Sequence, residues 1–198
     1  MKHLNNLQNI PCVILSGGKS LRMGEDKSLL PFGKYSSMSE YIYCKMSNIF
    51  KNVYFSSKEN KFSFLEDNDI IIDKSDIYSP MIALYTILEK LDNENIFIIT
   101  VDLPLIHESS INHLLKNALD SNYHVTIAKD SNNNTHPLCG VYNKQILPTI
   151  KYLLDENIHK INYLIKKSFN YQEILFEDST QFLNINTKEL YTQAKLLA

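Results

Sequence analysis

Short apolar runs alternate with longer polar and amphipathic segments along the chain. The runs are too short for helices and indicate strands, and Asn95–Val101 is typical of a strand buried on both faces. The predicted strands are Pro11–Ser16, Asn52–Ser57, Asp69–Ile72, Asn95–Val101, Tyr123–Ala128, Pro137–Tyr142, Tyr171–Phe176 and Phe182–Ile185. The polar stretch Asp130–Thr135 predicts a surface loop between two of them.

Between these runs, apolar residues recur at helical intervals. Ser37 and Glu40 have the spacing of a capping box, which predicts a helix that begins after Ser37. Pro80 stands where a first-turn proline is tolerated. The other predicted helices are Ser79–Leu91, Ser109–Leu119, Lys144–Asp155, His159–Ser168 and Thr187–Leu197. Strands that alternate with helices indicate an α/β fold, and we expect one three-layer domain over residues 1–198 with a mostly parallel sheet.

The ends of two predicted strands point to a site. In such sheets, ligands bind beyond the carboxyl ends of the strands, near a switch point. The first strand ends at Ser16 and the strongest one is followed by Asp102, so we expect both to face the site. Asp102 is a candidate metal ligand, because one or two carboxylates with substrate phosphates commonly hold Mg²⁺. The alternative is that Asp102 makes a turn or caps the helix after Pro104.

Composition narrows the class of protein. The apolar fraction of 44% is ordinary for a globular domain, and the net charge of −2 argues against a nucleic-acid partner. No run is long enough to span a membrane, and the amino-terminal residues lack the apolar region of a signal peptide. The three cysteines lack metal-ligand spacing. We therefore expect a reduced, cytoplasmic protein without a disulfide framework or structural zinc.

A cluster of glycines follows the first predicted strand. Four of the five glycines, and the only arginine, Arg22, lie within residues 17–33. Adjacent glycines let backbone N–H groups approach phosphate oxygens, and Lys19, Arg22 and Lys27 add positive charge. The segment matches neither GxxxxGK[ST] nor GxGxxG, which disfavours a P-loop NTPase and a Rossmann dehydrogenase. The alternative is a glycine-rich surface turn.

This segment resembles a family signature. Gly17-Gly18, Arg22-Met23-Gly24 and Asp26-Lys27 match the pattern of the molybdenum cofactor guanylyltransferases, the MobA family. The resemblance continues through Asp76–Met81, Thr100–Pro104, His136-Pro137 and Phe182–Thr187. Ser16, Ser79 and Val101 depart from it, and Ser79 replaces a glycine that would matter if it touches the base or ribose.

The resemblance implies a fold and a reaction. It implies a Rossmann-like nucleotidyltransferase fold of the GT-A-like type, and transfer of GMP from GTP to molybdopterin with release of pyrophosphate. The cofactor would be Mg²⁺. Transient contacts with proteins that deliver molybdopterin or receive the finished cofactor are implied as well. The Gly17-Gly18 form is similar to the guanylyl rather than the cytidylyl branch.

The resemblance also assigns site residues. The catalytic candidates are Arg22, Lys27 and Asp102, with Asp102 as the metal ligand. The nucleotide-binding candidates are Leu15, Ser16, Gly17, Gly18, Lys27, Asp76 and Asp102. The candidates on the pterin side are His136, Asn184 and Asn186, of which the asparagines would face one side of a strand.

Purely structural roles are the alternatives to these assignments. Lys27 is alternatively a solvated lysine, and Asp76 an N-cap of the Ser79–Leu91 helix. Asn184 and Asn186 are alternatively turn residues before a helix capped by Thr187. Two other functions stay open. One is a related nucleotidyltransferase that uses CTP or a sugar phosphate, and the other is a nucleotide-binding module without catalysis.

Overall fold

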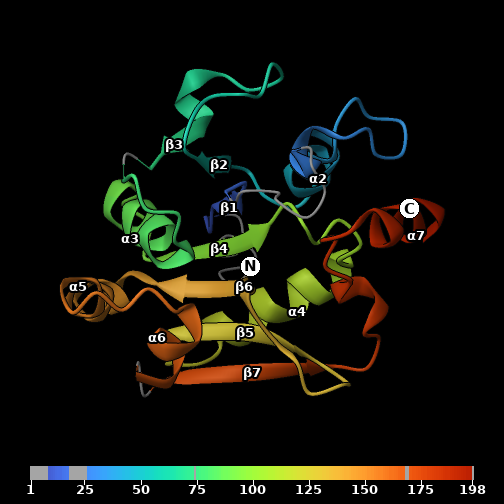
Figure 1. Ribbon diagram of the computed structural model, residues 1–198. Helices are drawn as coiled ribbons and strands as arrows, with labels where there is room; N and C mark the ends of the chain where they lie inside the picture. The colour runs from blue at the N-terminus through green and yellow to red at the C-terminus, as the bar shows by residue number, and fades with distance from the viewer. Residues whose placement is uncertain (1–8, 18–25, 74, 168–169, 198) are drawn as a thin grey trace.

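A mixed β-sheet forms the centre of the molecule. The computed structural model describes residues 9–17, 26–73, 75–167 and 170–197. In this part of the chain the sheet has seven strands in the order β3-β2-β1-β4-β6-β5-β7 (Figure 1). The strands are β1 Cys12–Leu15, β2 Val53–Ser57, β3 Ile70–Ile72, β4 Asn95–Thr100, β5 Val125–Asp130, β6 Thr135–Asn143 and β7 Tyr171–Phe176. Only β6 among them runs antiparallel to its neighbours, which confirms the mostly parallel mixed sheet.

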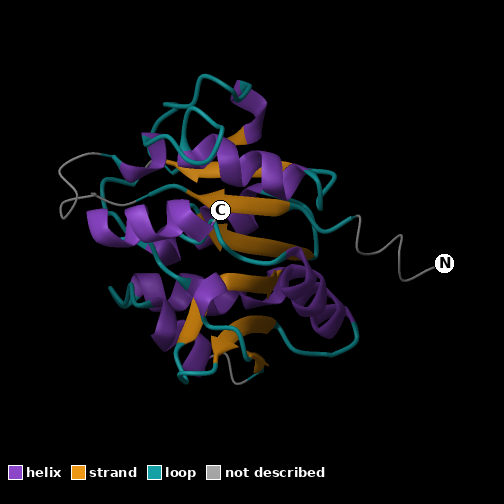
Figure 2. Cartoon of the chain, turned by 90° about the vertical axis from the view of Figure 1, so that its right-hand side faces the viewer, coloured by secondary structure: helices purple, strands orange, loops and turns teal. Residues whose placement is uncertain are grey.

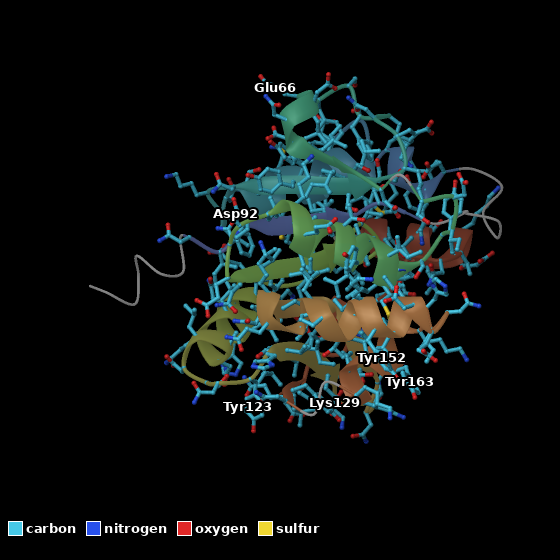
Figure 3. The ribbon with its side chains drawn as sticks, turned by 90° about the vertical axis from the view of Figure 1, so that its left-hand side faces the viewer. Glu66, Asp92, Tyr123, Lys129, Tyr152 and Tyr163 are labelled. Carbon is cyan, nitrogen blue, oxygen red and sulfur yellow. The ribbon has the colours of Figure 1, made fainter. Side chains whose placement is uncertain are left out.

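Helices cover both faces of this sheet. They are α2 Met38–Ser47, α3 Pro80–Lys90, α4 Glu108–Leu119, α5 Leu147–Asp155, α6 Ile161–Lys167 and α7 Lys188–Leu197. Side chains alternate between the faces of a strand. Accordingly, Cys12 and Ile14 pack in the core under α2, α4 and α7, whereas Val13 and Leu15 pack under α3, α5 and α6. Figure 2 looks onto the first face and Figure 3 onto the second. The predicted three layers are confirmed.

The local signals at helix starts have the expected structure. Ser37 caps α2, and its side chain accepts the backbone N–H of Glu40 at 3.0 Å. Ser79 caps α3, and its Oγ accepts the backbone N–H groups of Met81 and Ile82. One predicted helix divides into two elements, a 3₁₀ turn over Lys144–Ile146 followed by α5. None of the helices in the described ranges is long and apolar enough to cross a membrane.

The predicted strand over Phe182–Ile185 is wrong. Phe182 instead ends the 3₁₀ turn Thr180–Phe182, and residues 183–186 carry no regular structure. The backbone N–H of Ile185 donates to the carbonyl oxygen of Asp102 at 3.1 Å. This segment therefore crosses the carboxyl edge of the sheet instead of extending it, so the expected strand alternation of Asn184 and Asn186 does not apply.

Two adjacent strands create the switch point. From β1 the chain proceeds to β2 and β3 on one side, whereas β4 lies on the other side of β1. The backbone N–H of Val101 donates to Leu15 and that of Ser16 to Ser56, so the strand ends are bound together. A crevice at such a point is where open α/β sheets bind ligands. Ser16 and Asp102 therefore lie at the same edge of the sheet, and that both face the site stays a prediction.

Candidate active site

Lys27 joins three segments at the carboxyl edge. It begins the 3₁₀ turn Lys27–Leu29, which is capped by the side chain of Asp26. The Lys27 ammonium lies 2.7 Å from Asp102 Oδ2 and donates to Asn186 Oδ1 at 2.7 Å and to the carbonyl oxygen of Ile185 at 3.0 Å. Its side chain is only 15% exposed, so Lys27 is not the solvated lysine of the alternative interpretation.

Asp102 is held in a turn directly after β4. Its side chain is 21% exposed and pairs with Lys27, while the N-cap of α4 is His107. The alternative that Asp102 caps this helix is therefore wrong. Burial raises the pKa of the Asp102 carboxyl group, and the positive charge of Lys27 works against that rise. The arrangement is a partly desolvated carboxylate whose charge depends on a nearby cation.

A second acid supports this arrangement. Asp26 accepts hydrogen bonds from the backbone N–H and the hydroxyl of Ser28, and it forms an ion pair with Lys61. Burial disfavours its ionised form, but the bonds from Lys61 and Ser28 outweigh burial and hold the pKa of Asp26 below its usual value. Asp26 thus fixes the turn from which Lys27 extends. The sequence shows Asp26 beside Lys27, but not its pairing with Lys61.

A cavity of about 200 Å³ lies at the carboxyl ends of β1, β2 and β4, next to the start of α3. Its wall is mostly apolar and comes from the ends of the strands and the start of α3. The lining residues are Leu15, Gly17, Ser56, Ser57, Lys58, Asp73, Tyr78, Ser79, Pro80, Ala83, Thr100 and Leu138. The volume is below the roughly 300–1,000 Å³ of pockets for drug-sized ligands. The cavity therefore suits part of a ligand, such as one heterocyclic base.

The acid that lines this cavity is Asp73. Asp73 follows β3, is buried, and pairs with Lys58 at 2.6 Å. Asp76 is exposed and does not line the cavity. Asp76 does not cap α3 either, because Ser79 does. The position of Asp73 directly after an apolar run was the available sequence signal, and it is the same signal that singles out Asp102.

A third group of candidates lies in a separate hollow of about 420 Å³. The His136 ring stacks on Phe182 with a centroid distance of 4.5 Å, and its Nε2 lies 3.1 Å from Asp130 Oδ2. Asn184 also lines this hollow, whereas Asn186 belongs to the Lys27 group. The structure therefore divides the three pterin-side candidates between two places.

The predicted cap of the last helix is present, because the hydroxyl oxygen of Thr187 accepts the backbone N–H of Leu190 at the start of α7.

The remaining candidates are at the glycine-rich segment. Leu15 and Gly17 line the cavity, and Ser16 is buried with no hydrogen-bond partner for its Oγ among the described residues. Gly18 and Arg22 lie outside the described residues. Part of the expected anion-binding loop therefore borders the cavity, and its other part is not described.

Comparison with known proteins identifies the family. The model of the MobA-like NTP transferase domain matches residues 12–170. The chain belongs to this family. Molybdenum cofactor guanylyltransferase of Campylobacter jejuni is 42% identical over 96% of this chain and 97% of its own length. The Helicobacter pylori protein of the same name is 32% identical over 95% and 92%.

Solved structures of several proteins, with a nucleotidyltransferase among them, share the fold. A protein of Aquifex aeolicus VF5 matches with a TM-score of 0.74 and 32% identity, over 92% of this chain and 96% of that one. Molybdopterin-guanine dinucleotide biosynthesis protein A of Archaeoglobus fulgidus matches with a TM-score of 0.80 and 18% identity, over 95% and 98%. A cytidylyltransferase of Francisella tularensis matches with 0.74 at 13% identity, over 96% and 100%. At such low identity the last two similarities show the fold alone, and it is the predicted nucleotidyltransferase fold.

Proposed function

We propose that this protein transfers GMP from GTP to molybdopterin. A phosphate oxygen of molybdopterin forms a bond to the α-phosphorus of GTP. The bond from that phosphorus to the bridging oxygen breaks, and pyrophosphate leaves with the electron pair. The observation that carries the proposal is the Lys27–Asp102–Asn186 group, which lies beside an apolar cavity at the switch point. Full-length relatives named molybdenum cofactor guanylyltransferase support the choice of substrates.

Within this proposal, the cavity holds the guanosine and the charged group holds the phosphates. The backbone groups of Leu15 and Gly17 contact the base edge, since both residues line the cavity. Asp76 is exposed on the segment that leads to the cavity, and its carboxylate serves a ribose hydroxyl. Backbone N–H groups at Gly18 and the guanidinium of Arg22 bind the phosphates that become the leaving group.

Lys27 and Asp102 act on the charge of the reaction. Phosphoryl transfer needs little covalent help from the protein, so positioning and electrostatic stabilisation dominate. The ammonium of Lys27 neutralises phosphate charge as it builds up on the leaving group. Because its side chain is mostly buried, this interaction is weakly screened by water. Asn186 orients the ammonium through its Oδ1 atom.

The oxygens of Asp102 and Asn186 fit a divalent cation. Both already contact one positive group, the Lys27 ammonium, at 2.7 Å each. No group of three or more His, Cys, Asp or Glu side chains suited to a metal occurs among the described residues. Mg²⁺ usually takes one or two carboxylates together with substrate phosphates, so a single aspartate is sufficient. When bound, Mg²⁺ would neutralise charge on the phosphates.

The pterin would lie towards His136 and Asn184. Both line the hollow next to α7, and the stack of His136 on Phe182 presents an aromatic surface to a ring system. The hydrogen bond to Asp130 fixes the orientation of the imidazole. Asn186 would serve between this side and the phosphates, and its contact with Lys27 supports this role.

The proposal is tested by incubating the protein with Mg²⁺, GTP and molybdopterin. We expect stoichiometric release of pyrophosphate and formation of the guanine dinucleotide, measured by mass spectrometry. Asp102→Asn should lower turnover by at least about 100-fold, a typical loss for one electrostatic group in an active site. Asp120→Asn, which changes an exposed aspartate at the end of α4, is the matched control and should leave turnover unchanged. Full turnover in Asp102→Asn would contradict the assignment.

A further inference from the structure

An exposed aromatic side chain stands in the wall of the apolar cavity. Tyr78 lines this cavity, yet its side chain is 52% exposed. It lies between β3 and α3, two residues before Pro80, which also lines the cavity. Large aromatic side chains gain free energy when apolar surface is covered. A ligand in the cavity would cover the exposed part of Tyr78.

Lys58 holds the segment that carries Tyr78. Its ammonium donates to Asp73 Oδ2 at 2.6 Å, to the carbonyl oxygen of Ser75, and to the carbonyl oxygen of Ile77 at 2.9 Å. A lysine ammonium has three protons to donate, and these three acceptors match them. The same nitrogen lies 5.3 Å from the centroid of the Tyr78 ring, within the range of a cation–π contact.

The other side of the segment is fixed as well. Ser79 caps α3 through its Oγ, and this hydroxyl also donates to the carbonyl oxygen of His159 at 3.4 Å. The Ser79 hydroxyl is thus committed to backbone groups. Tyr78 therefore lies between two anchored residues. The carbonyl oxygen of Ile77 accepts a hydrogen bond from Lys58, and Ser79 caps α3.

We propose that Tyr78 is a base-binding residue whose ring stacks on the guanine of GTP, and that Lys58 is the positioning residue that holds this ring. The proposal rests on the proposed function, because it assumes that the cavity takes the nucleoside. Aromatic rings stack on any base, and the strength of stacking grows with the π-surface of the base. Tyr78 therefore favours a purine over a pyrimidine.

The chain offers a direct probe, because it contains no tryptophan. Tyr78→Trp introduces a single tryptophan whose fluorescence guanine quenches when the two rings stack. Tyr123→Trp is the matched control. Tyr123 is 45% exposed but lines a different cavity with Glu94, Asn95 and His124, at the amino ends of β4 and β5 (Figure 3). We expect saturable quenching by GTP at position 78 and none at position 123.

Binding should depend on the ring. Equilibrium dialysis with labelled GTP should show dissociation constants about 5- to 150-fold higher for Tyr78→Ala, the loss that corresponds to one base-stacking contact. Tyr78→Phe should bind as the wild type does. Tyr152→Ala removes an exposed tyrosine from α5 and should leave GTP binding unchanged (Figure 3).

The role of Lys58 has its own readout. Lys58→Gln should raise KM for GTP without changing kcat, because it releases the ring and leaves the Lys27 group intact. Lys58→Arg should restore KM. An unchanged KM in Lys58→Gln would overturn the positioning role.

The two levels of the proposal fail in distinguishable ways. Wild-type GTP affinity in Tyr78→Ala, or saturable GTP binding to Tyr78→Trp by dialysis without quenching, would overturn base stacking and leave guanylyl transfer standing. Absence of GTP binding by the wild-type protein would overturn both. Equal thermal unfolding temperatures of the variants show that any loss of binding does not reflect unfolding.

Discussion

Replacing Lys27 by methionine removes the charge that connects β4, the 3₁₀ turn and the segment before α7. The methionine side chain is one atom shorter and carries no charge, so Asp102 loses its cation, and Asn186 and Ile185 lose a donor. Breaking a buried ion pair costs about 3–5 kcal/mol. Because the two side chains are still 15% and 21% exposed, we expect about 2–3 kcal/mol in the free protein.

This loss of stability is measurable by thermal or urea unfolding in the absence of nucleotide. For a domain of this length, 1 kcal/mol corresponds to roughly 2–4 °C, so the unfolding midpoint should fall by about 4–12 °C. Turnover should fall by at least about 100-fold, as for other groups that stabilise charge in a transition state.

Two further variants make the Lys27 test specific. Lys151→Met removes an ammonium from an exposed ion pair with Asp155 of 2.9 Å, and it should leave stability and turnover unchanged. The double variant Lys27→Met/Asp102→Asn removes both charges and should recover most of the lost stability, since no unpaired charge remains. If Lys27→Met unfolds at the same temperature as Lys151→Met, the ion pair does not organise this edge and the reasoning is refuted.

Three other predictions concern stability. Gly140→Ala should cost about 3 kcal/mol or more, since a Cβ there would lie 2.2 Å from the carbonyl oxygen of Thr126. A Cβ at Gly17 would meet no atom of the described residues within 4 Å, so Gly17→Ala should be neutral in the same unfolding assay. Burial lowers the pKa of Lys45 to about 8 from an unfolded value near 10.4, so the unfolded state binds more protons between these values and stability should rise with pH across that window. Urea unfolding at several pH values should show this rise in the wild type and a smaller one in Lys45→Met. Ser79→Ala should cost about 1 kcal/mol through loss of the α3 cap, and Ser79→Gly only a few tenths; equal losses in calorimetry would contradict the capping role.

Local signals in the sequence were sufficient for most elements of the fold. The Ser37 capping box and the short apolar runs are patterns of residues that are close together in the sequence. The structure has α2 and the seven strands at the positions that these patterns predict. The Phe182–Ile185 strand failed because a long-range bond decides its conformation. The N–H of Ile185 donates to Asp102, and no pattern within the segment encodes that partner.

The candidate site was predictable in part, for the same reason. Asp102 follows a buried strand, and this position alone places its carboxylate at the sheet edge. The contact of Lys27 with Asn186 spans 159 residues, and that of Lys58 with Asp73 joins two different strand ends. Such contacts depend on how strands are ordered in the sheet, which periodicity does not specify. The resemblance to a family predicts that Lys27 lies near the nucleotide, and the structure shows its contacts with Asp102, Ile185 and Asn186.

Gly140 illustrates a signal that becomes readable only in three dimensions. In the sequence it is a lone glycine within the predicted strand Pro137–Tyr142, with no role beyond easing that strand. In the structure, the pairing of β5 with β6 shifts register next to Ile127, and Gly140 lies against the backbone of Thr126 and Ile127. The missing Cβ is therefore what allows β5 to pair closely with β6.

The specificity constant for each nucleotide tests guanylyl transfer most directly. The protein is supplied with Mg²⁺ and molybdopterin, and pyrophosphate release is followed with GTP, CTP, ATP and UTP in separate reactions. We expect release with GTP and background rates with the other nucleotides. Release with CTP and not with GTP would contradict guanylyl transfer and place the protein with the cytidylyl-transferring enzymes.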